Sequence, residues 1–278
     1  MSTGRYERLA EAGVNVEDRG YQFADGVYEV CLVVDGRYWD EEGHLARLKR
    51  SLAELKIAAP MGERALKSVM REILRRNRLT NALVYIQVTR GVASRNHPFP
   101  ERPVAPSLVM TAKRFVASKY ERLAEKGVTV VTAPDIRWAR ADIKSISLLP
   151  NVLAREAAAR AKAAEAWLVR DGKVTEGSAS NAWIVNDKNE VVTHPLTNEI
   201  LGGITRATVI ACAEALQIKV IERPFSLAEA KAAREAFITS ATNMVMPVVA
   251  IDGDKVGAGK PGPIARRLRE AYIAHCSG

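Results

Sequence analysis

The apolar residues in the first part of the chain change from a two-residue repeat to a helical repeat, which predicts a hairpin followed by helices. Apolar and polar residues alternate over residues 21–39, on either side of Asp35-Gly36, a pair suited to a two-residue turn. Over residues 41–57 the leucines recur on one helical face, and a second amphipathic helix is predicted from Pro60 to about residue 77. Residues 6–12 are also helix-like.

The rest of the chain alternates between strand-like and helix-like segments. The strand-like segments are 82–89, 107–113, 128–132, 166–175, 182–194, 237–239 and 244–251. Helices are predicted at 148–166, 204–216 and 263–275, and Ser226-Leu-Ala-Glu229 fits a capping box that opens a further short helix. This order predicts a mixed α/β fold.

Residues 114–122 are polar and interrupt the periodicity, so we expect them to separate two domains. At 278 residues the chain is long enough for two domains of ordinary size. The expected division is a small amino-terminal α/β domain at 1–113, a linker at 114–122 and a carboxy-terminal domain at 123–278.

The net charge of +9 invites comparison with nucleic-acid-binding proteins, and the basic residues are densest at 64–78. In that segment, however, apolar residues recur at helical spacing, so the Lys and Arg side chains are expected to form the solvated face of an amphipathic helix. Nucleic-acid binding is therefore disfavoured.

Cysteine usage and hydropathy indicate a protein of a reducing compartment. Cys31, Cys212 and Cys276 are scattered and odd in number, without the spacing of a zinc site or a disulfide framework. The histidines also lack metal-ligand spacing. No apolar run is long enough to span a bilayer, and the amino terminus lacks the apolar core of a secretory signal. We expect a cytoplasmic protein without a metal site or a membrane partner.

One lysine is a candidate for chemistry. Lys144 is followed by Ser-Ile-Ser-Leu-Leu and an alanine-rich run, which predicts that its amine lies where a strand or turn passes into a buried helix. Apolar surroundings favour the free amine over the ammonium, and a Schiff-base lysine needs the free amine. Most lysines have no such role, so the assignment of Lys144 depends on the segments that surround it.

Five segments occur in the order of one enzyme family over residues 16–275. They are Arg-Gly-Tyr-Gln-Phe-Ala-Asp-Gly-Val-Tyr-Glu-Val at 19–30, Gln-Val-Thr-Arg-Gly-Val-Ala-Ser-Arg-Asn-His at 87–97, the stretch 135–155, Thr-Glu-Gly-Ser-Ala-Ser-Asn at 175–181 and Gly-Ile-Thr-Arg at 203–206. In these segments the chain resembles the fold-type IV pyridoxal-phosphate enzymes, and most closely the D-amino acid aminotransferases. The resemblance implies two α/β domains with the active site between them, and transamination between a D-amino acid such as D-alanine and a 2-oxo acid such as 2-oxoglutarate.

The resemblance also implies which residues hold pyridoxal 5′-phosphate. Lys144 would form the Schiff base and act as the catalytic base, and Glu176 would keep the pyridine nitrogen protonated. The phosphate would lie on the N–H groups of Ile204 and Thr205 at a helix start, after the flexible Gly202-Gly203 pair. The other implied contacts are Arg47 as the phosphate cation, Leu201 against the ring, and Ser240, Ala241 and Thr242 beside the phosphate. Ala241 departs from the family pattern, in which a threonine is common, so only a backbone N–H is expected there.

Substrate recognition is implied for Tyr28 and for Arg95-Asn-His97. An arginine can hold an α-carboxylate through two parallel hydrogen bonds, and a histidine and a phenol can complete its surroundings. In the family the Arg-x-His pair comes from the partner subunit, which implies a homodimer whose subunits exchange Arg95 and His97. Without the family, the Arg-Asn-His sequence indicates an exposed polar loop.

Other functions stay open on the same fold: a branched-chain L-amino acid aminotransferase, an amine transaminase or an aminodeoxychorismate lyase. The Arg95-x-His97 pair favours the D-amino acid enzymes, because the resemblance to the other relatives does not extend to it. A basic nucleic-acid-binding protein is the alternative from a different class. Residues 257–262 have the letters of a dinucleotide fingerprint, but the chain ends before a second strand.

Overall fold

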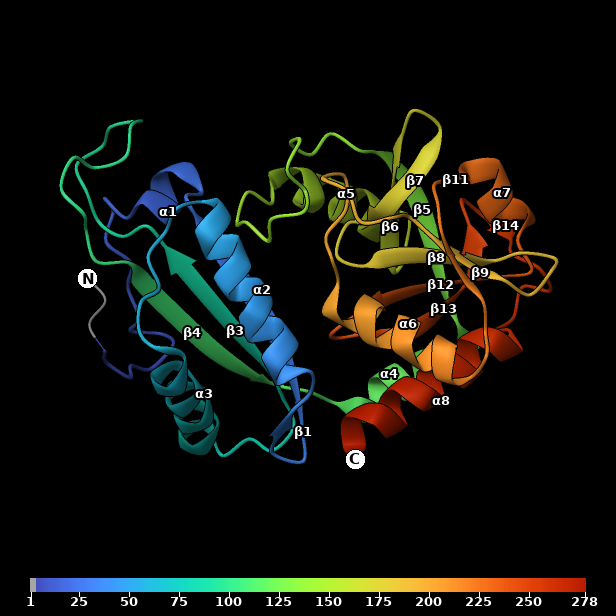
Figure 1. Cartoon of the computed structure of the whole chain (residues 1–278), viewed down its shortest axis with the longest axis horizontal. Coiled ribbons are helices and arrows are strands. Elements are labelled where there is room, and N and C mark those ends of the chain that lie inside the picture. Colours follow the sequence, from blue (N-terminus) through green and yellow to red (C-terminus); the bar gives the residue numbers. More distant parts are fainter. Residues whose placement is uncertain (1–3) are drawn as a thin grey trace. The chain divides into compact units, whose positions relative to one another are not determined.

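The computed structural model describes residues 4–278, which form two compact units (Figure 1). The first unit runs to Phe115 and includes Ile143–Ser147, and the second contains Val116–Asp142 and Leu148–Gly278. The segment around Lys144 therefore belongs to the first unit, although in sequence it lies between two parts of the second. This differs from the simple division into 1–113 and 123–278.

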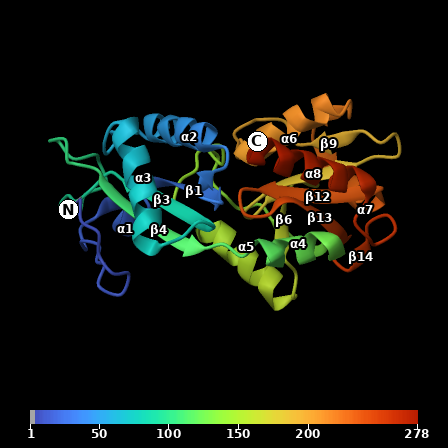
Figure 2. The same ribbon diagram turned by 90° about the horizontal axis from the view of Figure 1, so that it is seen from below.

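The first unit is built on a four-stranded antiparallel sheet in the order β2-β1-β3-β4. Its strands are β1 (Gly26–Val34), β2 (Arg37–Tyr38), β3 (Ala82–Thr89) and β4 (Ser107–Arg114), and its helices are α1 (Arg19–Phe23), α2 (Glu41–Glu54) and α3 (Glu63–Asn77). Helices α2 and α3 cover one face of the sheet (Figures 1 and 2). Their buried leucine, isoleucine and methionine side chains pack on the inward-facing valines of β1 and β3. The predicted hairpin at Asp35-Gly36 is confirmed.

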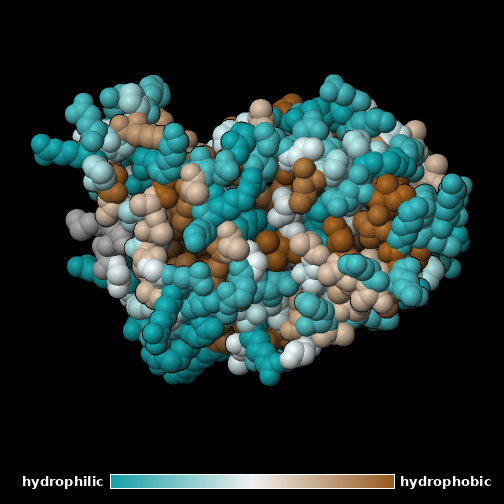
Figure 3. Space-filling model, viewed as in Figure 1, coloured by the Kyte–Doolittle hydropathy of each residue, from teal (hydrophilic) through white to brown (hydrophobic). Residues whose placement is uncertain are grey.

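The outer face of α3 is hydrophilic, as Figure 3 shows at the lower left. Four of its basic side chains are paired with acids: Lys67 with Glu42 and Glu63, Arg71 with Glu41, and Arg75 and Arg76 with Glu72. These pairs offset much of the positive charge of the helix, and its apolar side packs into the core. The segment is thus the solvated face of an amphipathic helix, as the sequence predicts.

The second unit contains a ten-stranded mixed sheet in the order β10-β9-β8-β12-β13-β5-β6-β7-β11, with β14 paired to β13. The pairs β9–β10, β5–β13 and β5–β6 are parallel, and the others are antiparallel. The strands are β5 (Val128–Pro134), β6 (Glu165–Arg170), β7 (Lys173–Gly177), β8 (Asn181–Val185), β9 (Val191–Thr193), β10 (Val220–Glu222), β11 (Phe225–Ser226), β12 (Glu235–Ser240), β13 (Met244–Ile251) and β14 (Asp254–Lys255).

Helices lie on both faces of this sheet. They are α4 (Ala117–Lys126), α5 (Leu149–Arg160), α6 (Ile204–Ala215), α7 (Leu227–Ala232) and α8 (Pro263–Ser277). Helices α6 and α8 lie on one side of the strands, and α4 and α5 lie on the other (Figure 2). The core between them includes Trp183 and Phe237, whose rings stack with centroids 5.4 Å apart. The predicted capping box at Ser226 and Glu229 is confirmed.

Two features near the amino terminus differ from the sequence prediction. Residues 6–12 form a turn at 9–11 instead of a helix, and these residues are exposed, so no packed face supports helical structure there. Helix α1 is absent from the sequence prediction, because five residues are too short to show a helical repeat. Its start is fixed by Asp18, whose side chain accepts a hydrogen bond from the Gly20 N–H.

The other differences lie between β4 and β6. The expected linker at 114–122 is partly helical, since α4 begins at Ala117. The helix predicted at 148–166 ends at Arg160, and strand β6 begins at Glu165, because Lys162 has a φ of 57° and ends the helical path. Helix α5 is not a buried helix either: it buries Ala154 and Ala158, whereas its larger apolar side chains are exposed. In the described chain, 4–278, none of the helices has the length and hydropathy needed to cross a membrane.

We expect Ser226→Ala to lower the free energy of unfolding by about 0.5–2 kcal/mol, because α7 loses half of its capping box. Ser226 Oγ accepts a hydrogen bond from the Glu229 N–H at 3.1 Å, and Glu229 Oε2 accepts one from the Ser226 N–H at 2.8 Å. Urea denaturation followed by circular dichroism measures the change. Ser68→Ala, on the exposed side of α3, is the control. Equal losses in the two variants would contradict a specific capping contribution.

Candidate functional site

Lys144 lies in a short segment that pairs with the start of β1. Its carbonyl accepts a hydrogen bond from the Tyr28 N–H at 3.0 Å, and the Ile146 N–H donates to the Gly26 carbonyl at 3.0 Å. Val27 and Ser145 form an antiparallel bridge between these contacts. The Lys144 Nζ atom is 4.3 Å from the centroid of the Tyr28 ring. The structure thus brings two sequence-predicted residues together and fixes both through the backbone.

Arg47 projects from α2 into a buried ion pair with Glu29 of β1. Its Nε and Nη2 atoms donate to the two carboxylate oxygens at 2.7 and 2.8 Å, and His44 Nδ1 lies 2.8 Å from Glu29 Oε2. The Glu29 side chain is fully buried. Burial alone would raise the pKa of Glu29, but the charge and hydrogen bonds of Arg47, with His44, lower this pKa to about 2. The guanidinium is therefore held in one orientation by an ionised partner.

Arg95 and His97 lie exposed in the loop between β3 and β4. Both side chains approach the ring of Phe23 at the end of α1. The Arg95 Cζ atom is 4.7 Å from the ring centroid, and the His97 ring centroid is 5.5 Å from it. The Phe23 ring thus contacts both the Arg95 guanidinium and the His97 imidazole at the surface. A guanidinium and an imidazole together are suited to bind a carboxylate.

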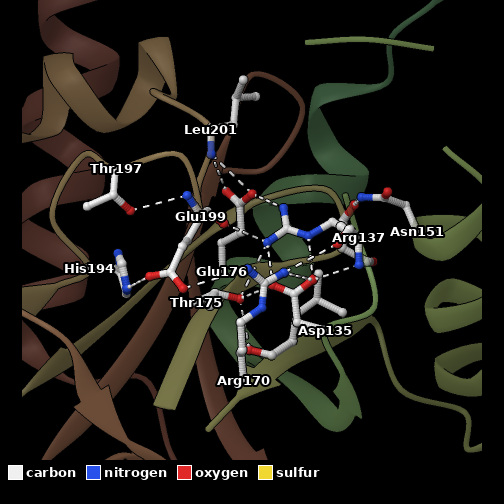
Figure 4. Close-up of polar contacts among 12 residues, drawn as sticks. Asp135, Arg137, Asn151, Arg170, Thr175, Glu176, His194, Thr197, Glu199 and Leu201 are labelled. Atoms are coloured by element: carbon white, nitrogen blue, oxygen red, sulfur yellow. Dashed lines mark hydrogen bonds and ion pairs between the residues drawn. The ribbon is translucent and has the colours of Figure 1, made fainter. Parts of the chain in front are cut away.

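Glu176 of β7 is a buried carboxylate surrounded by hydrogen-bond donors (Figure 4). It accepts hydrogen bonds from Arg137 Nη1, from Asn181 Nδ2 at 2.9 Å and from the Leu201 N–H at 3.1 Å. Asn181 Nδ2 also donates to the Leu201 carbonyl at 2.9 Å. The side-chain amide of Asn181 therefore bridges Glu176 and Leu201. The position of Glu176 is therefore determined by three separate segments of the chain.

Arg137 connects Glu176 to a second buried carboxylate, Asp135. Its Nε and Nη2 atoms lie 2.9 and 2.8 Å from the Asp135 oxygens, and Nη2 also donates to the Glu199 carbonyl at 2.8 Å (Figure 4). Burial would lower the pKa of Arg137, but Asp135 and Glu176 raise it above its ordinary value. Burial would likewise raise the pKa of Asp135, and Arg137 lowers it. All three groups are thus arranged as charged partners.

Helix α6 begins with Ile204 and the buried Thr205, directly after Gly203. The N–H groups of a first helical turn have no carbonyl partner within the helix and favour an anion. Gly203 has an ordinary φ of −65°, but a Cβ atom there would lie 2.0 Å from Asn181 Oδ1. The glycine is required for this close approach, and not for the flexibility that the sequence suggests.

Ser240 ends β12, and Ala241 and Thr242 lie in the turn that leads to β13. Ser240 Oγ accepts a hydrogen bond from the Asn243 N–H at 3.1 Å, which leaves the hydroxyl proton to donate elsewhere. The turn is supported by Arg269 of α8, which donates to the Asn243 carbonyl at 3.1 Å. The backbone here is therefore well anchored although its side chains are small.

The predicted site residues fall into one set in each unit. The first unit holds Tyr28, Arg47, Arg95, His97 and Lys144, and the second holds Glu176, Leu201, Ile204, Thr205, Ser240, Ala241 and Thr242. The sequence prediction lacks the residues that orient them: Glu29, His44, Asp135, Arg137 and Asn181. A glutamate within the apolar strand Val-Tyr-Glu-Val-Cys-Leu was a readable signal for a buried ion pair.

Comparison with known proteins gives a consistent result. The family model described as amino-transferase class IV matches residues 26–251. The chain is 42% identical to a D-alanine aminotransferase of Bacillus licheniformis over 271 residues, which cover 98% of this chain and 94% of the relative. It is also 42% identical to the D-alanine aminotransferase of Staphylococcus haemolyticus over 269 residues, or 97% and 94% of the two chains.

Solved structures resemble the fold over nearly its whole length. The branched-chain amino acid aminotransferase of Escherichia coli aligns with a TM-score of 0.89 at 24% identity, covering 98% of this chain and 92% of that one. A branched-chain amino acid aminotransferase of T.th., solved with pyridoxamine 5′-phosphate, aligns with a TM-score of 0.88 at 27% identity, covering 97% and 91%.

We expect Glu29→Gln to lower the free energy of unfolding by about 3–5 kcal/mol at pH 7, because Arg47 stays buried without its carboxylate partner. The pKa of Glu29 is lowered from 4.5 to about 2 in the folded protein. A lowered pKa stabilises the folded state above the ordinary pKa, and this contribution is lost as the pH falls through the folded-state value. The difference between the variant and the native protein should therefore shrink from pH 4.5 towards pH 2.

Urea unfolding at a series of pH values measures this difference. Glu101→Gln, in the exposed part of the loop before β4, is the control and should match the native protein at each pH. If the free energy of unfolding of Glu29→Gln is lower than that of the native protein by the same amount at every pH, the loss of the ionised pair is not the cause.

Proposed function

The chain belongs to the amino-transferase class IV family, and we propose that it catalyses pyridoxal-phosphate-dependent transamination between a D-amino acid and a 2-oxo acid. D-Alanine and 2-oxoglutarate are the representative pair. The similarity to D-alanine aminotransferases over almost the whole chain carries this proposal. The fold alone would not, because it is shared with the branched-chain enzymes.

The residues present fit pyridoxal phosphate. Such a cofactor needs an amine for its aldehyde, a carboxylate for its pyridine nitrogen and donors for its phosphate. Lys144 offers the amine, and Glu176 is a carboxylate held in place by Arg137, Asn181 and Leu201. When bound, the cofactor supplies an aldehyde that takes up the amino group and a ring that stabilises negative charge at the substrate Cα.

Lys144 is the residue that we propose for covalent attachment and for proton transfer. Its amine would take a proton from the substrate Cα as a general base and would then return it as a general acid. The backbone pairing with Tyr28 and the contact with its ring limit the directions in which the amine can point. The hand of amino acid would then be set by where the substrate carboxylate is held relative to this amine.

The remaining cofactor contacts are proposed from the same fit. Glu176 would keep the ring nitrogen protonated, and Leu201 would pack against the ring. Arg47, held by Glu29, is the cation for the phosphate, and the N–H groups of Ile204 and Thr205 at the start of α6 are its main-chain donors. The turn at Ser240, Ala241 and Thr242 adds a hydroxyl and backbone N–H groups.

For the substrate carboxylate we propose Arg95 and His97, with Tyr28. The exposure of the Arg95–His97 loop supports the further proposal of a homodimer in which each subunit lends this loop to the site of the other. The partners are then small amino and 2-oxo acids, without nucleic acid or membrane. We also propose a cytoplasmic location, which the scattered and odd-numbered cysteines support because their spacing shows no disulfide framework.

Assays with the enantiomers of alanine, glutamate and leucine, each with 2-oxo acid acceptors, test the reaction. We expect turnover of D-alanine with 2-oxoglutarate and much slower turnover of the L-enantiomers, because a carboxylate held by Arg95 and His97 presents the Cα hydrogen of only one enantiomer to Lys144. A preference for L-leucine would instead support a branched-chain aminotransferase, which the similarity of fold to those enzymes keeps as the second candidate.

Lys144→Ala should lower turnover by about 10²–10⁴-fold or more, because the general base is lost, while the variant still binds pyridoxal phosphate non-covalently. Borohydride reduction of the native holoenzyme followed by peptide mapping should place the label on Lys144. Lys113→Ala, which removes an exposed lysine of the first unit, is the control and should keep normal turnover. A label on another lysine would refute the assignment.

A further inference from the structure

The loop that carries Arg95 and His97 is exposed and has little regular structure, yet a buried arginine outside the loop holds its backbone. Arg19 is the first residue of α1, and its side chain is 4% exposed. The helix start is itself anchored, because the Arg19 N–H donates to the Gly91 carbonyl at 2.9 Å. Arg19 therefore reaches the loop from a fixed position.

The guanidinium of Arg19 binds three consecutive carbonyls of the loop. Its Nη1 atom donates to the Asn96 carbonyl at 2.6 Å and to the Pro98 carbonyl at 3.3 Å, and Nη2 donates to the His97 carbonyl at 3.2 Å. Only arginine has enough donors in one plane for this set together with a carboxylate. The contact fixes the backbone on both sides of His97.

The third nitrogen of Arg19 is paired with Asp25, which also binds Arg90. Arg19 Nε lies 2.8 Å from Asp25 Oδ2, and Arg90 Nε and Nη2 lie 2.7 and 3.0 Å from the two carboxylate oxygens. Burial would raise the pKa of Asp25, but Arg90 and Arg19 lower it below its ordinary value. Arg90 also lies over the ring of Phe99, with Cζ 3.7 Å from the centroid. Arg19 and Arg90 share the Asp25 carboxylate and both contact the loop. Arg19 binds the carbonyls of residues 96–98, and Arg90 lies over Phe99.

The ring of Phe23 links this clamp to the side chains that the loop presents. Arg19 Cζ lies 4.8 Å from the ring centroid and Arg95 Cζ lies 4.7 Å from it. The His97 ring contacts the same phenylalanine. Backbone and side chains of the loop are therefore oriented by one buried group and one ring.

We propose that Arg19 is a positioning residue for substrate recognition: by holding the carbonyls of residues 96–98, it sets where Arg95 and His97 meet the substrate carboxylate. The inference rests on the proposed function, because it takes that carboxylate as the ligand of Arg95 and His97. Four of the five N–H donors of Arg19 bind the loop or Asp25, so we assign Arg19 no direct contact with the substrate.

Arg19→Lys is the most informative variant, because lysine keeps the charge beside Asp25 but loses the planar set of donors. We expect KM for D-alanine to rise about 10–100-fold, since small displacements of a binding group have effects of this size. The value of kcat and the affinity for pyridoxal phosphate should change less than about twofold. Propionate carries the carboxylate of alanine but not its amine. Its affinity for the holoenzyme, measured by calorimetry, should fall by about the same factor as KM rises.

Arg102→Lys, at an exposed position of the same loop, is the matched control and should leave KM and propionate binding unchanged. If Arg19→Lys does not fold, Phe23→Leu should show the same selective rise in KM. A folded Arg19→Lys variant with unchanged KM and propionate affinity overturns the proposal. A rise in KM that is accompanied by equally large losses of kcat and of cofactor affinity overturns it as well, because such a pattern indicates a purely structural arginine.

Limited proteolysis separates this inference from the proposed function. Trypsin cuts after Arg95, and this cut should be faster in the Arg19→Lys holoenzyme than in the native protein, whereas the cut after Lys188, at an exposed turn of the second unit, should not change. If the native enzyme does not turn over D-alanine, the proposed function fails, and the cut after Arg95 still tests whether Arg19 holds the loop. An unchanged rate of cutting after Arg95 overturns the clamp whatever the substrate.

Discussion

The need to pair buried charge determines how the candidate site is built. Removing a carboxylate or a guanidinium from water costs several kcal/mol, which is recovered only by a well-placed partner. Glu29 with Arg47, Asp25 with Arg19 and Arg90, and Glu176 and Asp135 with Arg137 are all such pairs. Three of these contacts join segments distant in sequence, namely those of Glu29 with Arg47, Asp25 with Arg90 and Glu176 with Arg137, and they restrict the backbone near functional side chains.

These pairs give the two units different tasks within the proposed chemistry. In the first unit they orient groups that meet anions, namely Arg47 and the Arg95–His97 loop. In the second they orient a carboxylate, Glu176, with the start of α6 close by through Asn181 and Gly203. The sequence resemblance names the residues that act, and the structure adds those that hold them in place.

Local features of the fold could be predicted from the sequence because their causes are local. The Asp35-Gly36 turn, the capping box of Ser226 and Glu229, and the amphipathic helix α3 each depend on a few neighbouring residues. The alanine-rich run after Lys144 predicts one long helix, because alanine does not mark where a helix stops. The link from Arg137 to Glu176 joins residues 39 apart and leaves no periodic trace in the sequence. The role of Gly203 depends on Asn181, so composition alone suggests flexibility where the structure has a tight contact.

The segment Ile143–Ser147 belongs to the first unit although it follows part of the second unit in sequence, and this order matters during synthesis of the chain. During translation the ribosome releases β1 to β4 well before the strand-like segment that completes the edge of β1 at Tyr28. The edge of β1 at Tyr28 therefore lacks this pairing until the chain has grown past residue 147, and a fragment that ends at Phe115 lacks Ile143 from the core of the first unit. Completion of that edge and arrival of the lysine thus belong to the same stage of translation.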